Sequence, residues 1–330
     1  MSDKKKSSEL QVNIENIMKK TQYEYFDDWV TNFALNLPQI WKEKSAKELV
    51  AKNENAFNLE ENSAIIIGRG PSINRHNHLK ILADSDYQGT IVCCDGKLSD
   101  TLNAGVTPDK FKKFFVITID PYPDIKKHYD NEIIDVYGSK IKGLFSVLTN
   151  ISAMERVRES GIEVHWMHSL FDYNEGKKSF NNLSALMIRA QDDLHRLPAI
   201  QTGGNVGTSA WFAAWKILGC DTIALTGINH GWEEEDSWEK IISHGNMLDI
   251  NKVDKESPAF KKLFRKIHNP DFDCMCILDP LFQFYSEALK EFILRSPEWL
   301  KTINSTEGGS IFGERIKSMK FIDFLNSFRK

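Results

Sequence analysis

The stretch "IIIGRGPSIN", Ile65–Asn74, joins three β-branched residues to a glycine loop and to the start of a predicted helix. A run of β-branched residues favours a buried strand. Glycines directly after a strand allow close backbone approach to a ligand, and the N–H groups at a helix start suit an anion. Two interpretations therefore apply to Gly68, Gly70, Pro71 and Ser72: a loop that contacts a phosphate or nucleotide, or a tight structural turn.

Further strand-like segments follow this stretch and alternate with helical ones. They are Thr90–Cys94, Phe114–Ile119, Gly143–Leu148, Ile162–His165 and Thr222–Thr226, after a first strand at Ala64–Ile67 and a helix from about Asn74 to Ala83. Such alternation predicts βαβ units and a mostly parallel sheet. We expect an α/β, Rossmann-like fold with helices on both faces of the sheet. The carboxyl ends of its strands would then lie along one edge, where ligands bind.

Helical additions are expected at both ends of this core. Residues 1–60 predict a helical N-terminal extension, because apolar residues recur at helical spacing between Tyr25 and Trp41, although Pro38 interrupts the pattern. Residues 61–232 form the predicted nucleotide-binding domain. Residues 233–330 predict a mainly helical region that packs on the core.

The composition is that of a globular protein. The chain has 330 residues, a formal net charge of −4 and 41% hydrophobic residues. Nucleic-acid-binding proteins usually have an excess of basic residues, which this chain lacks, so we expect no nucleic-acid partner. No stretch approaches the roughly 20 apolar residues of a membrane span. We therefore expect a cytoplasmic protein without a membrane span. The sequence does not distinguish a monomer from an oligomer.

A second glycine turn, "TGGNVGT", precedes a helix rich in small residues. Its predicted contributions to an anion site are the helix N–H groups and the side chains and backbone of Thr202, Gly203, Gly204, Asn205 and Thr208. Close packing of the helix on the sheet, with an ordinary N-cap, explains the same pattern. Both interpretations stay open at this point.

Two carboxylates follow predicted strands. Asp95 precedes Gly96 after one strand, and Asp120 precedes Pro121 after the next. At the carboxyl edge of a parallel sheet, such groups bind ribose hydroxyls or hold Mg²⁺ that shields a diphosphate. Asp-Gly and Asp-Pro are also turn signals. No cofactor is certain from these residues, and Mg²⁺ is the one that they leave open.

Asn229 and His230 follow the last predicted strand of the core. Histidine titrates near neutrality, so His230 is a candidate acid or base, and a structural histidine is the alternative. Tyr122 is a candidate for stacking on a base, although core packing explains an aromatic residue equally well.

The chain resembles the MptE-like domain over roughly residues 62–232, through four motifs in the right order: IIIGRGPSIN, CCDGKLSDTLNAGVTPD, TIDPYP and GGNVGTSAWFAAWKILGCDTIALTGINHG. That domain is shared by archaeal 6-hydroxymethylpterin diphosphokinases and by the motility-associated-factor (Maf) group of flagellin glycosyltransferases. Thr302–Leu325 resembles the tail of the Maf proteins, which carries a similar T-E-G-G stretch. The Maf core is also similar to sialyltransferases that open with a Gly-Pro-Ser loop and use CMP-activated sugars.

The resemblance implies a nucleotide-dependent transferase, and within the family it favours a Maf-type glycosyltransferase. Its donor would be a nucleotide-activated sugar such as a CMP-nonulosonic acid, and its acceptor a protein or glycan that the sequence does not name. If the family's roles apply to the matching positions of this sequence, the nucleotide would be bound by Gly68, Gly70, Pro71 and Ser72. The phosphate or sugar would be contacted by Gly203, Gly204, Asn205 and Thr208. Glu307 would face the cleft or close a turn before Gly308.

Two other functions remain under the same resemblance. One is an ATP- and Mg²⁺-dependent diphosphokinase that uses Asp95 and Asp120. The other is a non-catalytic nucleotide-binding protein. The pterin kinases carry a D-x-D-G-like stretch where this chain has Asp120-Pro121-Tyr122-Pro123. One fewer clustered carboxylate favours sugar transfer, in which His230 or Asp120 would assist the acceptor hydroxyl.

Overall fold

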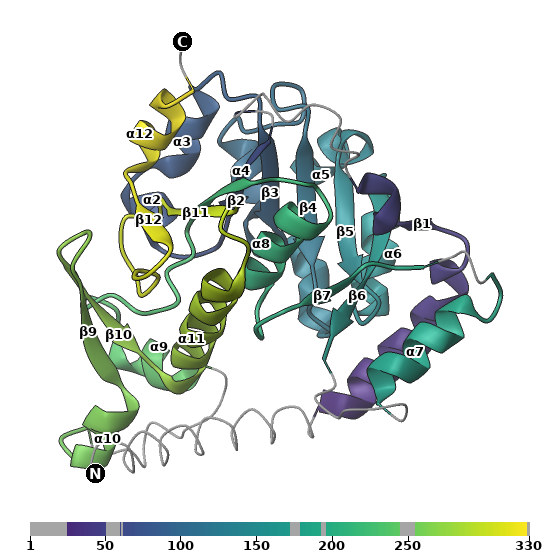
Figure 1. Ribbon diagram of the computed structural model, residues 1–330. Helices are drawn as coiled ribbons and strands as arrows, with labels where there is room; N and C mark the ends of the chain where they lie inside the picture. Colours follow the sequence, from purple (N-terminus) through teal and green to yellow (C-terminus); the bar gives the residue numbers. More distant parts are fainter. Residues whose placement is uncertain are drawn as a thin grey trace.

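A single parallel sheet forms the centre of the molecule (Figure 1). The computed structural model describes residues 25–50, 60, 62–171, 179–192, 196–244 and 255–328. The 10-stranded sheet has the order β1-β6-β5-β4-β3-β2-β8-β11-β12, and β7 pairs with β6 beside this path. Every pairing within it is parallel. The predicted α/β fold with a mostly parallel sheet is confirmed.

The bounds of the elements are as follows. The strands of the large sheet are β1 (Lys44–Ser45), β2 (Ser63–Ile67), β3 (Thr90–Cys94), β4 (Phe114–Thr118), β5 (Lys142–Ser146), β6 (Glu163–Leu170), β7 (Ala199–Gln201), β8 (Thr222–Thr226), β11 (Lys301–Asn304) and β12 (Ile316–Ser318). A separate antiparallel pair consists of β9 (Arg265–Asn269) and β10 (Cys274–Leu278).

The helices connect these strands. They are a helix over residues 25–40, then α2 (Ser72–Arg75), α3 (His78–Ala83), α4 (Leu98–Asn103), α5 (Glu132–Tyr137), α6 (Ile151–Glu159), α7 (Phe180–Arg189), α8 (Val206–Lys216), α9 (Trp238–Ser243), α10 (Pro258–Leu263), α11 (Pro280–Arg295) and α12 (Phe321–Asn326). Short 3₁₀ turns lie at Ala46–Leu49, Asp95–Lys97, Pro123–His128 and Gly138–Lys140. No described helix has both the length and the apolar run that a bilayer crossing requires.

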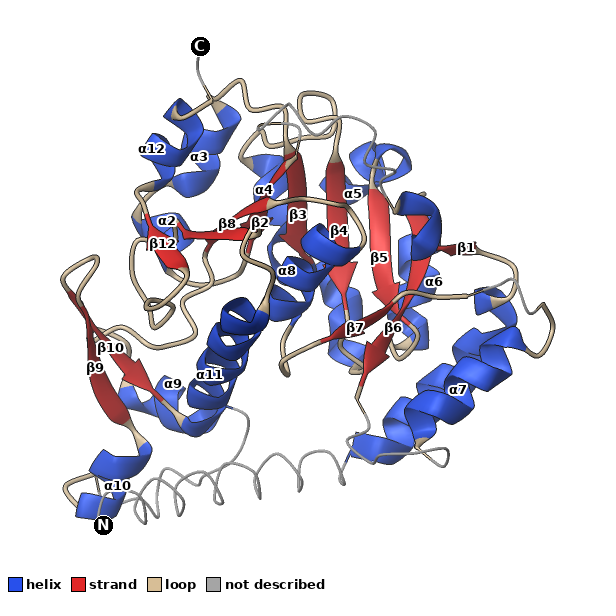
Figure 2. Cartoon of the chain, viewed as in Figure 1, coloured by secondary structure: helices blue, strands red, loops and turns tan. Residues whose placement is uncertain are grey.

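The central strands are buried on both faces, which explains why their sequences are continuous apolar runs. In β2, Ile65 and Ile67 belong to one apolar cluster, while Ala64 and Ile66 belong to another. The first cluster also takes residues of α3, α4, α5, α6 and α12, and the second takes residues of α8 and α11. The predicted helices on both faces are therefore present (Figure 2).

Two predicted helical segments differ in detail from the structure. The helix expected from about Asn74 to Ala83 is divided into α2 and α3, because Asn77 has a φ of 53°. Asparagine is one of the few residues that adopt this left-handed conformation readily. Pro38 does not end the N-terminal helix: it lies in the last turn, which the hydrogen bond from Trp41 N to Leu37 O closes.

The C-terminal region contributes strands that the sequence analysis did not predict. β11 pairs with β8 and β12 pairs with β11, so residues beyond 300 extend the large sheet. The β9–β10 pair is joined to the chain after β8 by a bridge between Trp232 and Ile277. The expected domain boundaries at residues 60 and 232 stay a prediction.

The sheet order places a topological switch point beside β2. The chain runs from β2 outward through β3, β4, β5 and β6, and β8 then returns to the opposite side of β2. In open parallel sheets, ligands bind outside the carboxyl ends of strands at such a point. The arrowheads of β4, β5 and β6 point toward the side of the molecule where α9 and the β9–β10 pair lie (Figure 2).

Candidate functional site

The glycine loop after β2 lies against the loop after β8. Gly68 N donates to Thr226 O at 2.8 Å, and Gly70 N donates to Gly227 O at 2.8 Å. A Cβ atom on either glycine would overlap the backbone of Gly227, and one on Gly70 would also overlap Asn229 Oδ1. Close approach of two loops therefore explains both glycines. A phosphate contact by the same loop stays a prediction.

Asn229 joins the two loops and keeps an unused donor. Ser72 Oγ donates to Asn229 Oδ1 at 2.9 Å. Asn229 is only 3% exposed, and its Nδ2 has no hydrogen-bond partner among the described residues. A buried N–H group without a partner is destabilising unless water or a ligand accepts from it. The carboxyl end of β8 thus presents a donor that is suited to a phosphate, hydroxyl or carbonyl oxygen.

The second glycine turn builds the N-terminus of α8. Gly203 and Gly204 have φ values of 54° and 81°, which favour glycine. Thr202 Oγ1 accepts from Gly204 N at 3.2 Å. Asn205 is the N-cap: its Oδ1 accepts from Thr208 N at 2.8 Å, and its Nδ2 donates to Thr208 Oγ1 at 3.0 Å. The N-cap interpretation is realised here, and the anion site that it prepares stays a prediction.

His230 links the β8 loop to this N-cap. Its Nε2 lies 3.3 Å from Asn205 Oδ1, which fits an Nε2–H donor and leaves the lone pair on Nδ1. Burial, with a smaller contribution from the charge of Lys290, lowers the pKa of His230 to about 3. The imidazole is therefore neutral near pH 7 and is a weak base. Its geometry suits a positioning residue better than a proton acceptor.

Asp95 and Asp120 lie at the carboxyl ends of neighbouring strands. Asp95 is buried; its Oδ1 accepts from Gly96 N at 2.6 Å, and its Oδ2 has no partner among the described residues. Burial raises the pKa of Asp95. Burial and then the charge of Asp95 raise the pKa of Asp120 to about 7. The two carboxyls interact as a pair that does not fully ionise near neutrality.

Two residues near this pair escaped the sequence analysis. A Cβ on Gly96 would lie 3.1 Å from Arg69 Cδ and 3.5 Å from His128 Nε2, so all three are neighbours. A side-chain hydrogen bond with Thr118 opposes the rise in the pKa of Asp95, followed by the charge of His128, the Gly96 N–H and the charge of Arg69. Arg69 is exposed, and its guanidinium makes no ion pair or hydrogen bond to the described residues. Its place inside a loop predicted to bind phosphate was the signal that could have identified it.

The carboxylates of Asp95 and Asp120 are oxygen ligands of the kind that Mg²⁺ prefers. Mg²⁺ is usually held by one or two carboxylates together with substrate phosphates. The unpartnered Asp95 Oδ2 is a suitable oxygen ligand, and Asp120 supplies the second. Within the described ranges, no group of three or more His, Cys, Asp or Glu side chains is arranged to hold a metal. A magnesium ion here would therefore depend on ligands from the substrate.

The two remaining predicted residues have different surroundings. Tyr122 is 36% exposed beyond Asp120, and its ring packs edge-on against Tyr25 at 5.2 Å. Glu307 is engaged in structural contacts: its Oε1 accepts from Phe321 N at 3.0 Å and lies 3.2 Å from His78 Nε2. Glu307 thus joins the T-E-G-G turn to α12, whereas Tyr122 keeps a solvent-accessible edge.

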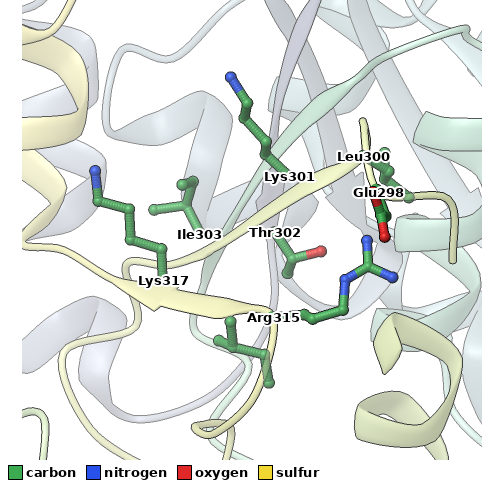
Figure 3. Close-up of a pocket in the computed structure, with 8 residues that line it drawn as sticks. Glu298, Leu300, Lys301, Thr302, Ile303, Arg315 and Lys317 are labelled. Atoms are coloured by element: carbon green, nitrogen blue, oxygen red, sulfur yellow. The ribbon is translucent and has the colours of Figure 1, made fainter. Parts of the chain in front are cut away.

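A separate cavity of about 310 Å³ lies at the opposite edge of the sheet, at the amino ends of β11 and β12. Figure 3 shows Lys301 and Lys317 pointing to one side of the two strands and Arg315 to the other. Arg315 donates to the carbonyls of Leu294 and Pro297, so it closes the end of α11. The cavity contains none of the predicted site residues.

Comparisons with known proteins concern the family and the fold of the chain. A family model described as "6-hydroxymethylpterin diphosphokinase MptE-like" matches residues 31–235. A solved structure described as a MAf glycosyltransferase from Magnetospirillum magneticum AMB-1 is similar, with a TM-score of 0.53 and 15% sequence identity over 86% of this chain. The match covers 38% of the length of that chain, and at this identity it shows a shared fold. No curated protein matches the sequence.

Proposed function

Because the chain belongs to the MptE-like family, we propose that it is a glycosyltransferase with a nucleotide-activated sugar donor. The family description and the description of the similar structure both name transferases. The observation that carries the proposal is the buried Asn229 amide, whose Nδ2 lacks a partner in the described chain. Asn229 bonds to Ser72 of the glycine loop, and the next residue, His230, contacts Asn205 at the start of α8.

The donor phosphate would lie at the switch point between β2 and β8. The N–H groups of Val206 and Gly207 begin α8 and have no partner within the helix. The helix dipole favours an anion at this position. Asn229 Nδ2 would supply a further hydrogen bond, and Arg69 would supply a positive charge. A nucleoside monophosphate leaving group would then be stabilised without a metal ion.

The proton chemistry favours Asp120 over His230. A carboxyl with a pKa raised to about 7 exists in both protonation states near neutrality. His230 binds a proton weakly, because burial lowers its pKa to about 3. We therefore assign the acid–base role in this part of the site to Asp120. His230 would position Asn205, and Asp95 would bind ribose or sugar hydroxyls.

A diphosphokinase is the second candidate, and the Asp95–Asp120 pair is the observation that favours it. If ATP and Mg²⁺ are the substrates, these carboxylates would hold the ion that bridges the phosphates. Mg²⁺ would supply charge neutralisation to the transferred group. This alternative requires both carboxyls to ionise, which their raised pKa values oppose in the absence of a cation.

Thermal unfolding against CMP, CDP, UDP, GDP and ATP, with and without Mg²⁺, tests the proposal. A ligand at about 100 times its Kd adds about 2.7 kcal/mol to the free energy of unfolding, a shift of a few degrees. We expect stabilisation by CMP in the absence of Mg²⁺. Stabilisation by ATP with Mg²⁺ alone would favour the diphosphokinase. No shift with any nucleotide would contradict both enzymes and the binding protein.

Two N-cap variants test whether the nucleotide binds at the start of α8. Asn205→Ala and Ser179→Ala each remove a side-chain acceptor from the start of a helix. Each loss should cost about 1 kcal/mol of stability. Only Asn205→Ala should also remove the stabilisation by nucleotide, because Ser179 caps α7. Equal nucleotide shifts in both variants would place the ligand elsewhere.

A further inference from the structure

A buried carboxylate outside the predicted site holds a histidine in a defined orientation. Asp279 is 0% exposed and is the N-cap of α11, where its Oδ1 accepts from Phe282 N at 2.8 Å. Its Oδ2 accepts from Trp232 Nε1 at 2.6 Å and from His244 Nδ1 at 2.6 Å. The Asp279 carboxylate thus accepts three hydrogen bonds: one from the backbone of α11, one from an indole and one from an imidazole. Together they fix its orientation.

The hydrogen bond to Asp279 determines which nitrogen of His244 is free. With Nδ1–H donated to the carboxylate, the lone pair of the neutral ring is on Nε2. The side chain is 27% exposed, and among the described residues its hydrogen bond is at Nδ1 rather than Nε2. The ring is held edge-on to Trp232 at 5.2 Å and against Phe282 at 4.5 Å.

This pair lies next to the candidate site. The Phe282 ring that contacts His244 is stacked on His230 at 6.4 Å, so a single aromatic ring adjoins both imidazoles. Trp232 follows His230 by two residues in the loop after β8. Its backbone N and O both bond to Ile277 at 2.8 Å, which fixes the loop against β10. The pair thus adjoins the carboxyl end of β8, on the side of α9 and α11.

We propose that His244 is the general base for the acceptor and that Asp279 is its positioning residue. The inference rests on the proposed glycosyl transfer and refines it. His244 Nε2 takes the proton of the acceptor hydroxyl as its oxygen bonds to the anomeric carbon of the donor. The bond from that carbon to the phosphate oxygen breaks, and the electron pair leaves with the nucleotide phosphate, whose charge the N–H groups at the start of α8 and Asn229 Nδ2 would stabilise.

The surroundings of the pair suit this role. The carboxylate stabilises the imidazolium that forms when Nε2 takes the proton. Lys240 of α9 places its ammonium 5.0 Å from the centre of the Trp232 ring and pairs with Asp236. The rings of Phe282 and Trp232 pack against the imidazole and cover part of it, which lowers the local dielectric around its bond to Asp279. Among the described residues, His230 Nδ1 has no hydrogen-bond partner of this kind.

CMP release from CMP-N-acetylneuraminic acid, with water as the acceptor, tests the inference on the full chain. We expect His244→Ala to lower kcat by about 100-fold or more. The stabilisation by CMP should be unchanged, and added imidazole should restore part of the rate. His268→Ala is the matched control, because His268 also contacts a carboxylate, Asp273, but on the exposed β9–β10 pair. It should retain the wild-type rate.

Asp279→Asn separates positioning from folding. Asparagine is an equally good N-cap, so α11 should remain capped. The neutral amide no longer stabilises the imidazolium, and we expect a lower kcat with little change in KM. A His244→Ala rate close to that of the wild type, or a loss that imidazole does not restore, would overturn this inference alone. A wild-type chain that releases no CMP would overturn the proposed donor and the inference with it.

Discussion

Asp120 should make the stability of the protein depend on pH. Its pKa is raised to about 7 in the folded state by burial and by the charge of Asp95, whereas an unfolded aspartate has a pKa of about 3.9. The folded state therefore binds more protons between these values. The free energy of unfolding should fall as pH rises from about 4 to about 7 and then level off.

Asp120→Asn should remove much of this fall. Above neutrality we expect the variant to be more stable than the wild type by about 2 kcal/mol, and the difference should vanish near pH 4. Urea unfolding at several pH values measures it. Asp124→Asn is the control, because Asp124 is exposed and its bond to Lys127 lowers its pKa. A wild-type dependence of stability on pH in Asp120→Asn would contradict the raised pKa of Asp120.

Gly70 and Gly96 offer a second comparison at single positions. A Cβ on Gly70 would overlap Asn229 Oδ1 and lie 2.6 Å from Gly227 O, so a packed side chain and a backbone must move. A Cβ on Gly96 meets the flexible Arg69 side chain at 3.1 Å. We expect Gly70→Ala to lose about 1–3 kcal/mol of stability and Gly96→Ala much less. Equal melting temperatures would show that the two loops are not in close contact.

Among the elements, α12 depends on a contact with the T-E-G-G turn, which comes 14 residues earlier in the chain. Glu307 in the T-E-G-G turn accepts from Phe321 N, the first residue of α12, and contacts His78 of α3. Glu307→Ala should expose the amides of α12 to faster hydrogen exchange, because it removes this charged acceptor. Asp323→Ala changes an exposed carboxylate of the same helix and should have little effect. Unchanged exchange in Glu307→Ala would argue against a capping role.

The whole sheet requires the C-terminal region. β11 covers the edge of β8, Trp211 Nε1 of α8 donates to Thr302 Oγ1 at 3.0 Å, and α11 contributes Leu289 to the core. A fragment ending at residue 235, the end of the family match, would leave β8 as an open apolar edge. We expect it to aggregate and to lack a cooperative unfolding transition by circular dichroism. Cooperative unfolding of this fragment would show that the core folds without β11.

Local sequence patterns determined the core of the fold. Thr90–Cys94 and Thr222–Thr226 are strands with the predicted bounds, because their continuous β-branched and apolar runs are buried on both faces. The family resemblance, drawn from motifs around these strands, is confirmed by the match over residues 31–235. β11 was missed, since the strand has four residues and its pairing with β8 joins segments far apart in the chain.

The candidate site divides in the same way. Asn205 and Asn229 belong to local motifs, from which their positions at a helix start and a strand end were predicted correctly. Their roles with a ligand stay predictions. The burial and low pKa of His230, and the contact between His244 and Asp279 across 35 residues, follow from the packing of distant segments. Burial and charge proximity depend on which distant segments pack together, and a local pattern does not contain that information.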